Sequence, residues 1–143
     1  MSADGMIWSA GADLQRAFLS GLRADSDVQA LLGTPARIYD DETSEPVFPC
    51  AQLERHEIAD RGSAGSAGQA HTITLGVRSR FGGRAAAHEI VGTLRAATDR
   101  LVLSLNGQRI VLVQTVYCDV MRTSDLREFR GIVRVRLLTE EAG

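Results

Sequence analysis

The sequence predicts an α+β fold in which helices pack against a mainly antiparallel, four-stranded sheet. Residues 73–77 and 133–137 alternate apolar and polar side chains, as strands with one buried face do. Residues 84–101 instead repeat apolar side chains at the spacing of a helix. Together with the turn signal Asn106-Gly107 before a long apolar run, these patterns predict two hairpins, one long helix and an N-terminal helical segment. The expected order is α-α-β-β-α-β-β, in a single domain that spans residues 1–143.

The N-terminal segment is expected to hold two helices that follow a flexible leader at residues 1–10. Asp13 is the predicted N-cap of the first helix, whose apolar residues fall at helical spacing: Leu14, Phe18, Leu19 and Leu22. A second, short helix is expected after residues 25–27, where any of three polar side chains can cap it. Gly33, which lies two residues before a proline, is expected to end this helix.

The first hairpin is predicted from two strands, Val47–Ile58 and His71–Phe81, joined by a long tip. The second strand has the clearer pattern, because its apolar residues alternate with polar ones: Ile73, Leu75 and Val77. Residues 60–69 (DRGSAGSAGQ) are small and polar and have no periodicity, so we expect a mobile loop at the tip.

A long helix is expected to start at Arg84, after the break at Gly82-Gly83, with one apolar stripe: Ala87, Ile90, Val91, Leu94, Ala97 and Leu101. The next strand, Gln108–Val120, is apolar on both sides. Simple alternation predicts its two apolar faces as follows: Ile110, Leu112 and Val116 on one, Val111, Val113 and Tyr117 on the other. In a domain of this size, a neighbouring subunit is a natural cover for the second face.

The final strand, Phe129–Thr139, alternates cleanly between inward and outward residues. Its inward residues are Val133, Val135 and Leu137, and its outward residues are Arg130, Arg134 and Arg136. The arginine row can meet an acidic partner surface or phosphate, or it can be a solvated face paired with Asp119 or Glu54. No aromatic residues are interleaved and the net charge is −2, so we expect a partner surface or a solvated face rather than a DNA site.

Composition excludes several classes of protein. The 143 residues are 44% hydrophobic and 24% charged, which is ordinary for a soluble folded domain. The apolar runs are too short for a transmembrane helix, and residues 1–11 lack the basic start of a secretory signal. All sixteen basic residues are arginine, which suits interfaces and also follows from codon bias in a GC-rich genome. Cys50 and Cys118 have no CxxC spacing, so we expect two small buried hydrophobes and no disulfide.

The residue types that carry enzyme chemistry do not form a recognisable motif. His56 and His71 can face each other across the first hairpin, but two imidazoles are too few for a metal site, so no metal or cofactor is expected. There is no Gly-x-Ser-x-Gly elbow, and residues 80–84 (RFGGR) lack the lysine and spacing of a phosphate-binding loop. We therefore expect a protein that is not an enzyme, with a pair formed by His88 and Glu89 as the remaining alternative.

Several short strings occur in an order that a known family shares: LQRAFL at 14–19, DVQALLG at 27–33, RIYD at 37–40, VFP at 47–49, GQRIV at 107–111, Arg122, GIVRVR at 131–136 and Thr139-Glu140. On these strings the chain resembles the tail-completion, or tail-terminator, proteins of long-tailed bacteriophages and of alphaproteobacterial gene transfer agents, from Leu14 to Glu140. The resemblance implies a structural virion protein without catalysis. Such proteins form a hexameric ring at the head-proximal end of the tail tube, stop its polymerisation and dock onto the head connector.

The resemblance also implies partners. These are further copies of the chain, the tail-tube protein and the head-completion or connector protein, with no membrane. A passing contact with DNA in the ring lumen is left open. Assembly would take place in the bacterial cytoplasm. The residues expected at subunit or partner contacts come from the apolar strand and the arginine row: Val111, Val113, Tyr117, Arg122, Arg130, Arg134 and Arg136. The alternatives are a neck or head-completion adaptor and a small ligand-binding α+β module.

Overall fold

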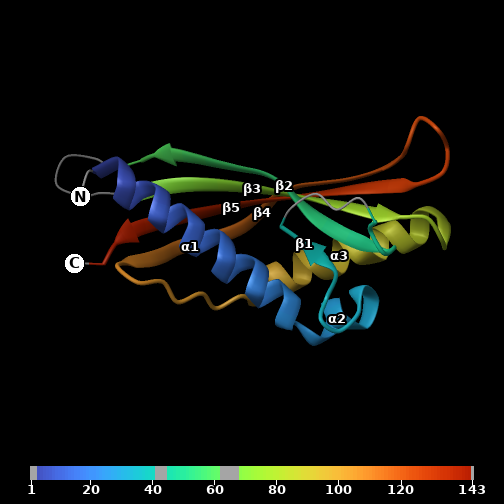
Figure 1. Ribbon diagram of the computed structural model, residues 1–143, viewed down its shortest axis with the longest axis horizontal. Coiled ribbons are helices and arrows are strands. Elements are labelled where there is room, and N and C mark those ends of the chain that lie inside the picture. Colours follow the sequence, from blue (N-terminus) through green and yellow to red (C-terminus); the bar gives the residue numbers. More distant parts are fainter. Residues whose placement is uncertain (1–2, 41–44, 62–67, 143) are drawn as a thin grey trace.

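The computed structural model describes residues 3–40, 45–61 and 68–142 of the chain (Figure 1). In chain order the elements are α1 (Ala3–Ala24), α2 (Ser26–Leu32), β1 (Ile38–Tyr39), β2 (Cys50–Asp60), β3 (Gly68–Ser79), α3 (Gly83–Arg100), β4 (Gln108–Arg122) and β5 (Phe129–Glu141). The predicted α+β class and the order of its helices and long strands are confirmed. None of the described helices is long and apolar enough to cross a membrane.

The sheet has five strands in the order β1-β2-β3-β5-β4, so the prediction of four strands was wrong. The additional strand, β1, has two residues and pairs in parallel with β2, which makes the sheet mixed. A two-residue strand has no alternation to detect, and tertiary bonds hold it: Arg23 donates to the Ile38 carbonyl from both Nε (3.0 Å) and Nη2 (2.7 Å). The four long strands are antiparallel, with β3 and β5 joining the two predicted hairpins.

The helices all lie on one face of the sheet, below it in Figure 1, and no described helix covers the opposite face. Helices α1 and α3 meet the buried residues of β3 and β5 in one core, whose largest fully buried side chains include Phe18, Leu14, Leu19, Leu22, Ile73, Leu75, Leu94 and Leu137. The stripe predicted for α3 is confirmed, because five of its six residues are buried and Leu101 packs partly buried against the same core. We call the uncovered side the outer face.

Helix α1 begins at Ala3, so residues 3–10 of the predicted leader are helical, and residues 1–2 lie outside the described residues. Asp13 is not an N-cap but lies inside the helix, where it pairs with Arg16 at 3.1 Å. The glycines of this segment disfavour a helix by propensity, but packing overrides them. Gly11 lies so close to the β2–β3 hairpin that a Cβ there would be 2.6 Å from Ile58 Cδ1.

The cap of α2 is confirmed, since Asp25 Oδ1 accepts hydrogen bonds from the backbone of Asp27 (2.9 Å) and Val28 (3.2 Å). Gly33 ends this helix, as predicted, with φ at +90°. The β2–β3 ladder reaches the pair Asp60↔Gln69, so both ends of the predicted 60–69 loop are strand. Its middle, residues 62–67, lies outside the described residues.

Candidate functional site

Strand β4 is the long edge strand of the sheet, and among the described residues no strand pairs with its outer edge. It runs for fifteen residues beside β5, and its register shifts at two places, between Ile110 and Leu112 and between Thr115 and Tyr117. Bulges of this kind are common on edge strands, where they bend the strand and increase its twist. The feature that sequence patterning singled out as two-sided is therefore an irregular free edge.

The two bulges change which side chains share a face. Each inserts an extra residue, and one extra residue reverses the alternation of everything that follows. Ile110 and Val113 both pack against the core, whereas Leu112 lies opposite Leu138 on the outer face. The prediction that Val113 shares a face with Val111 and Tyr117 was therefore wrong, as was the grouping of Ile110 with Leu112.

Strand β4 nevertheless exposes a concentration of apolar side chains. Five of the nine large hydrophobic residues that are exposed in the described chain belong to it, with 38–51% of each accessible. We call these five the β4 patch: Val111, Leu112, Val116, Tyr117 and Met121. Met121 was missed by sequence reasoning, although extending the strand two residues past Val120 would have included it. Large apolar side chains that are exposed together on one strand commonly mark a surface that another chain covers, whereas single exposed apolar side chains do not.

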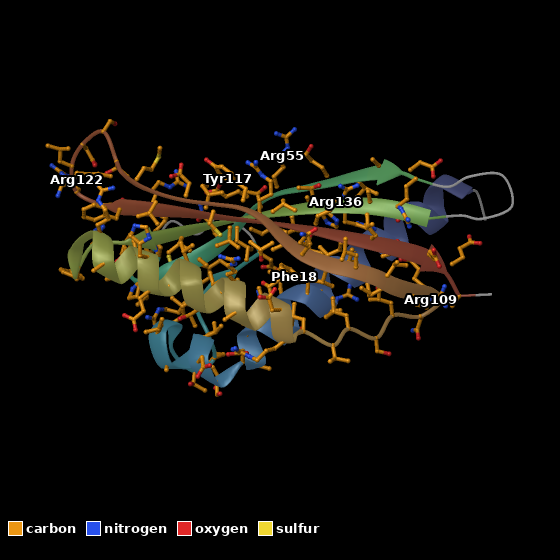
Figure 2. All side chains as sticks on the ribbon, turned by 180° about the vertical axis from the view of Figure 1, so that it is seen from behind. Phe18, Arg55, Arg109, Tyr117, Arg122 and Arg136 are labelled. Atoms are coloured by element: carbon orange, nitrogen blue, oxygen red, sulfur yellow. The ribbon has the colours of Figure 1, made fainter. Side chains whose placement is uncertain are left out.

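The predicted arginine row does lie on the outer face. Arg130, Arg134 and Arg136 alternate with the buried valines of β5, and Figure 2 shows Arg136 on the sheet with Arg55 and Tyr117 standing on the side away from Phe18. Arg134 lies over the ring of Tyr117 at 4.9 Å, so the row borders the β4 patch directly.

Much of the charge on this face is already paired. Arg130 forms a close ion pair with Glu54, and Arg55 pairs with Glu57 at 3.2 Å. Tyr117 donates from its hydroxyl to Asp119 Oδ2 at 3.3 Å. The outer face is thus a mixture of paired charges and apolar groups, which is the composition of a protein–protein contact and not of a bare phosphate-binding stripe.

Arg122, the remaining predicted contact residue, ends β4 and stacks over Phe129 at 4.9 Å. It lies at the far end of the strand from Arg109, as Figure 2 shows, and so apart from the middle of the β4 patch. Six of the seven candidate residues lie on the two strands predicted for them, whereas Arg122, expected in the connection after the strand, is the last residue of β4. The structure divides the seven between the edge, the outer face and the end of the β4–β5 hairpin.

The two histidines predicted to face each other do so, with His56 Nε2 2.9 Å from His71 Nδ1. Gln15 of α1 adds a third side chain to this row of contacts, since its Oε1 lies 3.2 Å from His56 Nδ1. Desolvation by burial, with the neighbouring imidazole of His56, lowers the pKa of His71 to about 4, and burial also lowers the pKa of His56. His71 is fully buried, which the sequence pattern did not indicate.

Chemistry-bearing side chains elsewhere are dispersed. In the part of the chain that the structure describes, no three metal-ligating residues come together. His88 and Glu89 both stand exposed on α3. Cys50 is buried as predicted, but Cys118 is exposed, and desolvation raises the pKa of both thiols, which keeps them protonated at neutral pH. Residues 80–84 form the predicted strand-to-helix turn, with Gly82 and Gly83 at positive φ.

A family model described as "Tail completion protein gp17" matches residues 16–140. The chain belongs to the tail completion protein gp17 family. Its fold is also similar to that of a chain solved in the "Virion of native gene transfer agent (GTA) particle", with a TM-score of 0.79 and 26% identity. That similarity covers 93% of this chain and 98% of the other. No curated protein matches the sequence.

The chain is a structural, non-enzymatic component of a virion or phage-like particle. The resemblance read from the short strings of the sequence is confirmed. In such a protein the functional site is where other chains bind, and the β4 patch with its arginine border is the candidate that the described residues offer.

Proposed function

We propose that this tail completion protein forms a hexameric ring that ends tail-tube polymerisation and joins the tail to the head. The observation that carries the proposal is the β4 patch on an unpaired sheet edge. A long apolar edge strand exposed on a lone chain invites pairing and aggregation, so natural proteins cover such edges. If a second copy of the chain covers the β4 edge, the same contact can repeat in every subunit of a ring.

Ring closure requires a heterologous contact, in which one surface of a subunit meets a different surface of the next. The β4 edge supplies the first surface. Val111 and Tyr117 would be buried at the centre of that contact, with Val113 supporting the strand from the core side. Arg134 and Arg136 would lie at its polar rim, where Arg130 is already paired with Glu54. The hexameric number follows the resemblance to tail terminators.

The purified protein tests the ring by native mass spectrometry and light scattering. Wild type should be a hexamer, and the double change Val111→Glu/Tyr117→Glu should yield a folded monomer because it places charge in the centre of the contact. The matched control is Val102→Glu, since Val102 is 93% exposed and lies outside β4. A double variant that stays hexameric would contradict the assignment of the β4 patch.

The role in the particle is tested by electron microscopy of cells that lack the gene. DNA-filled heads separate from tails of uncontrolled length are expected, because nothing would then stop the tube or join it to the head. Heads separate from tails of normal length would instead identify a neck adaptor. Intact particles would contradict both assignments. In this proposal the ring assembles in the bacterial cytoplasm, contacts the tail-tube protein and the connector, and encloses the path of the DNA.

A further inference from the structure

The end of the molecule opposite the start of α1 carries a second unusual surface. It is built from the turn between β3 and α3 (residues 78–84) and from the β4–β5 hairpin end (residues 121–130), which lie together on the right in Figure 1. We call these two segments the loop end. They hold six arginines and two carboxylates, whereas the chain as a whole has a net charge of −2. Positive charge is therefore concentrated here.

Two phenylalanine rings hold four of these arginines in place. Phe48 lies under the guanidinium carbons of Arg78 and Arg80, at 4.9 and 4.0 Å from the ring centroid. Phe129 does the same for Arg84 and Arg122, at 5.4 and 4.9 Å. Guanidinium groups stacked in this way have lost side-chain freedom before any partner arrives, so a partner that binds them loses less entropy.

The carboxylate of Glu128 joins the two segments. Arg78 donates to it from Nε (2.9 Å) and Nη2 (3.0 Å), and Arg80 lies 3.8 Å away. The bond from Arg78 lowers the pKa of Glu128. Within the described residues no salt bridge involves Arg84, Arg122 or Arg127, although Arg127 interacts electrostatically with Asp125. With six arginines and two carboxylates, the loop end keeps an excess of positive charge.

Leu126 stands at the tip of this surface in an uncommon conformation. Its φ is +62°, the left-handed region that a leucine rarely adopts, and it is 69% exposed. The loop imposes this conformation through bonds from Leu126 N to Thr123 O (2.9 Å) and from Thr123 Oγ1 to Asp125 Oδ1 (2.6 Å). The other segment of the loop end carries a second large apolar side chain, Phe81, which is 78% exposed. An exposed leucine held against its own backbone preference, at the same end of the molecule as this exposed phenylalanine, indicates a surface shaped for contact.

We propose that the loop end is a docking surface, separate from the β4 patch, for a different protein whose surface has an apolar recess among acidic side chains. Leu126 and Phe81 would enter the recess, and the stacked arginines would meet the carboxylates around it. Protein fits better than nucleic acid because a phosphate backbone offers nothing to bury these large apolar side chains. The inference rests on the proposed function in one respect, namely that the partner is a component of the same particle.

The test uses tails and DNA-filled heads purified separately from cells that lack this gene. Each preparation is incubated with the added protein, and binding is measured by co-sedimentation. Leu126→Asn removes the apolar side chain but keeps a residue that tolerates positive φ, and Arg127→Glu reverses a charge that forms no salt bridge in the described chain. Their matched controls are Val102→Asn and Arg95→Glu, which make the same changes at exposed positions elsewhere.

Wild type and both controls should bind one of the two preparations, and both loop-end variants should bind it at least about tenfold more weakly. All variants should retain the wild-type oligomer and unfolding midpoint. Equal binding by Leu126→Asn and wild type would overturn the docking surface while leaving the ring intact. Loss of the oligomer in Leu126→Asn would also overturn it, because the leucine would then contact another copy.

A nucleic-acid site is distinguished by a short fluorescent duplex DNA. If duplex binding falls in Arg127→Glu but not in Leu126→Asn, the loop end binds phosphate and the proposal is wrong. Failure of the wild-type protein to bind either heads or tails would instead refute the proposed function itself. The two failures are thus separable in a single set of samples.

Discussion

Mild acid should weaken the packing of α1 against the β2–β3 hairpin, because the hydrogen bonds of the buried pair His56–His71 require both imidazoles to be neutral. Gln15 Oε1 can only accept a hydrogen bond, so His56 Nδ1 donates to it and His56 Nε2 accepts from His71 Nδ1. This leaves His71 Nε2 unprotonated and buried, with no hydrogen-bond partner among the described residues. Protonation would place a positive charge on that atom with nothing to receive its hydrogen.

The size of the effect follows from the pKa of His71. In the folded protein it is about 4, against an ordinary 6.5. Between these values the unfolded chain binds a proton at His71 that the folded chain excludes. The contribution of His71 to the free energy of unfolding is therefore fully present above pH 6.5 and is lost as the pH is lowered toward 4. For a single group this corresponds to a loss of about 2 kcal/mol in the free energy of unfolding at about pH 5.

The assay is urea denaturation followed by circular dichroism, near neutral pH and at about pH 5, for wild type and His71→Leu. Carboxylates that titrate in this range do so in both proteins, so the difference between the two losses isolates His71. Wild type should lose about 2 kcal/mol more than the variant between the two conditions. His88→Leu is the control, because His88 is exposed on α3 and should leave the wild-type loss unchanged. Equal losses for wild type and His71→Leu would refute the reasoning.

Three further predictions concern packing and charge, each measured by the same denaturation assay. Gly131→Ala should destabilise by about 1–3 kcal/mol, since its Cβ would be 2.5 Å from a valine methyl of α3, whereas Gly92→Ala, with nothing within 4 Å, should stabilise by up to about 1 kcal/mol. Phe18→Ala should cost about 3–5 kcal/mol because the ring is fully buried where α1 meets the sheet, and a loss below 1 kcal/mol would contradict that burial. Glu128→Gln should cost about 1–2 kcal/mol near neutral pH, because it removes the negative charge and one of the two oxygens that accept hydrogen bonds from Arg78. Because Arg78 lowers the pKa of Glu128, this cost should disappear in acid as the wild-type carboxyl becomes protonated, and a cost independent of pH would count against the pairing.

The exclusive use of arginine acquires a physical reading from the structure. Guanidinium groups stack on Phe48, Phe129 and Tyr117, and the Arg78 guanidinium binds both oxygens of one carboxylate. An ammonium group can do neither in the same geometry, because it is a compact charge without a planar fork. Codon bias remains an adequate reason for the absence of lysine, but lysine in place of arginine would remove the planar stacking and the paired hydrogen bonds at these sites.

Local patterns in the sequence were sufficient for the regular elements. Alternation placed the inward residues of β5, Val133, Val135 and Leu137, and all three are fully buried. Helical spacing located the stripe of α3, and a polar residue followed by a glycine delimited α2. These signals work because a residue in a regular helix or strand points in a direction that depends only on its position in the repeat. The short strings that carried the family resemblance lie within or beside these regular elements, such as residues 14–19 inside α1 and residues 131–136 inside β5.

The tertiary structure decided what depends on contacts between distant residues. The bulges of β4 moved Val113 to the core and Leu112 to the outer face, and no periodic pattern contains an inserted residue. Strand β1 is held by hydrogen bonds from Arg23, which is distant in the sequence. Helix α1 continues through Gly11 where the β2–β3 hairpin packs against it, and His71 of that hairpin is buried. The conformation of Leu126 likewise comes from a loop closed by its neighbours. Composition and periodicity therefore determined the class of fold and the face that each regular element buries. The proposed contacts rest on the free edge and the loop end, and these depend on pairing and packing that only the folded chain brings together.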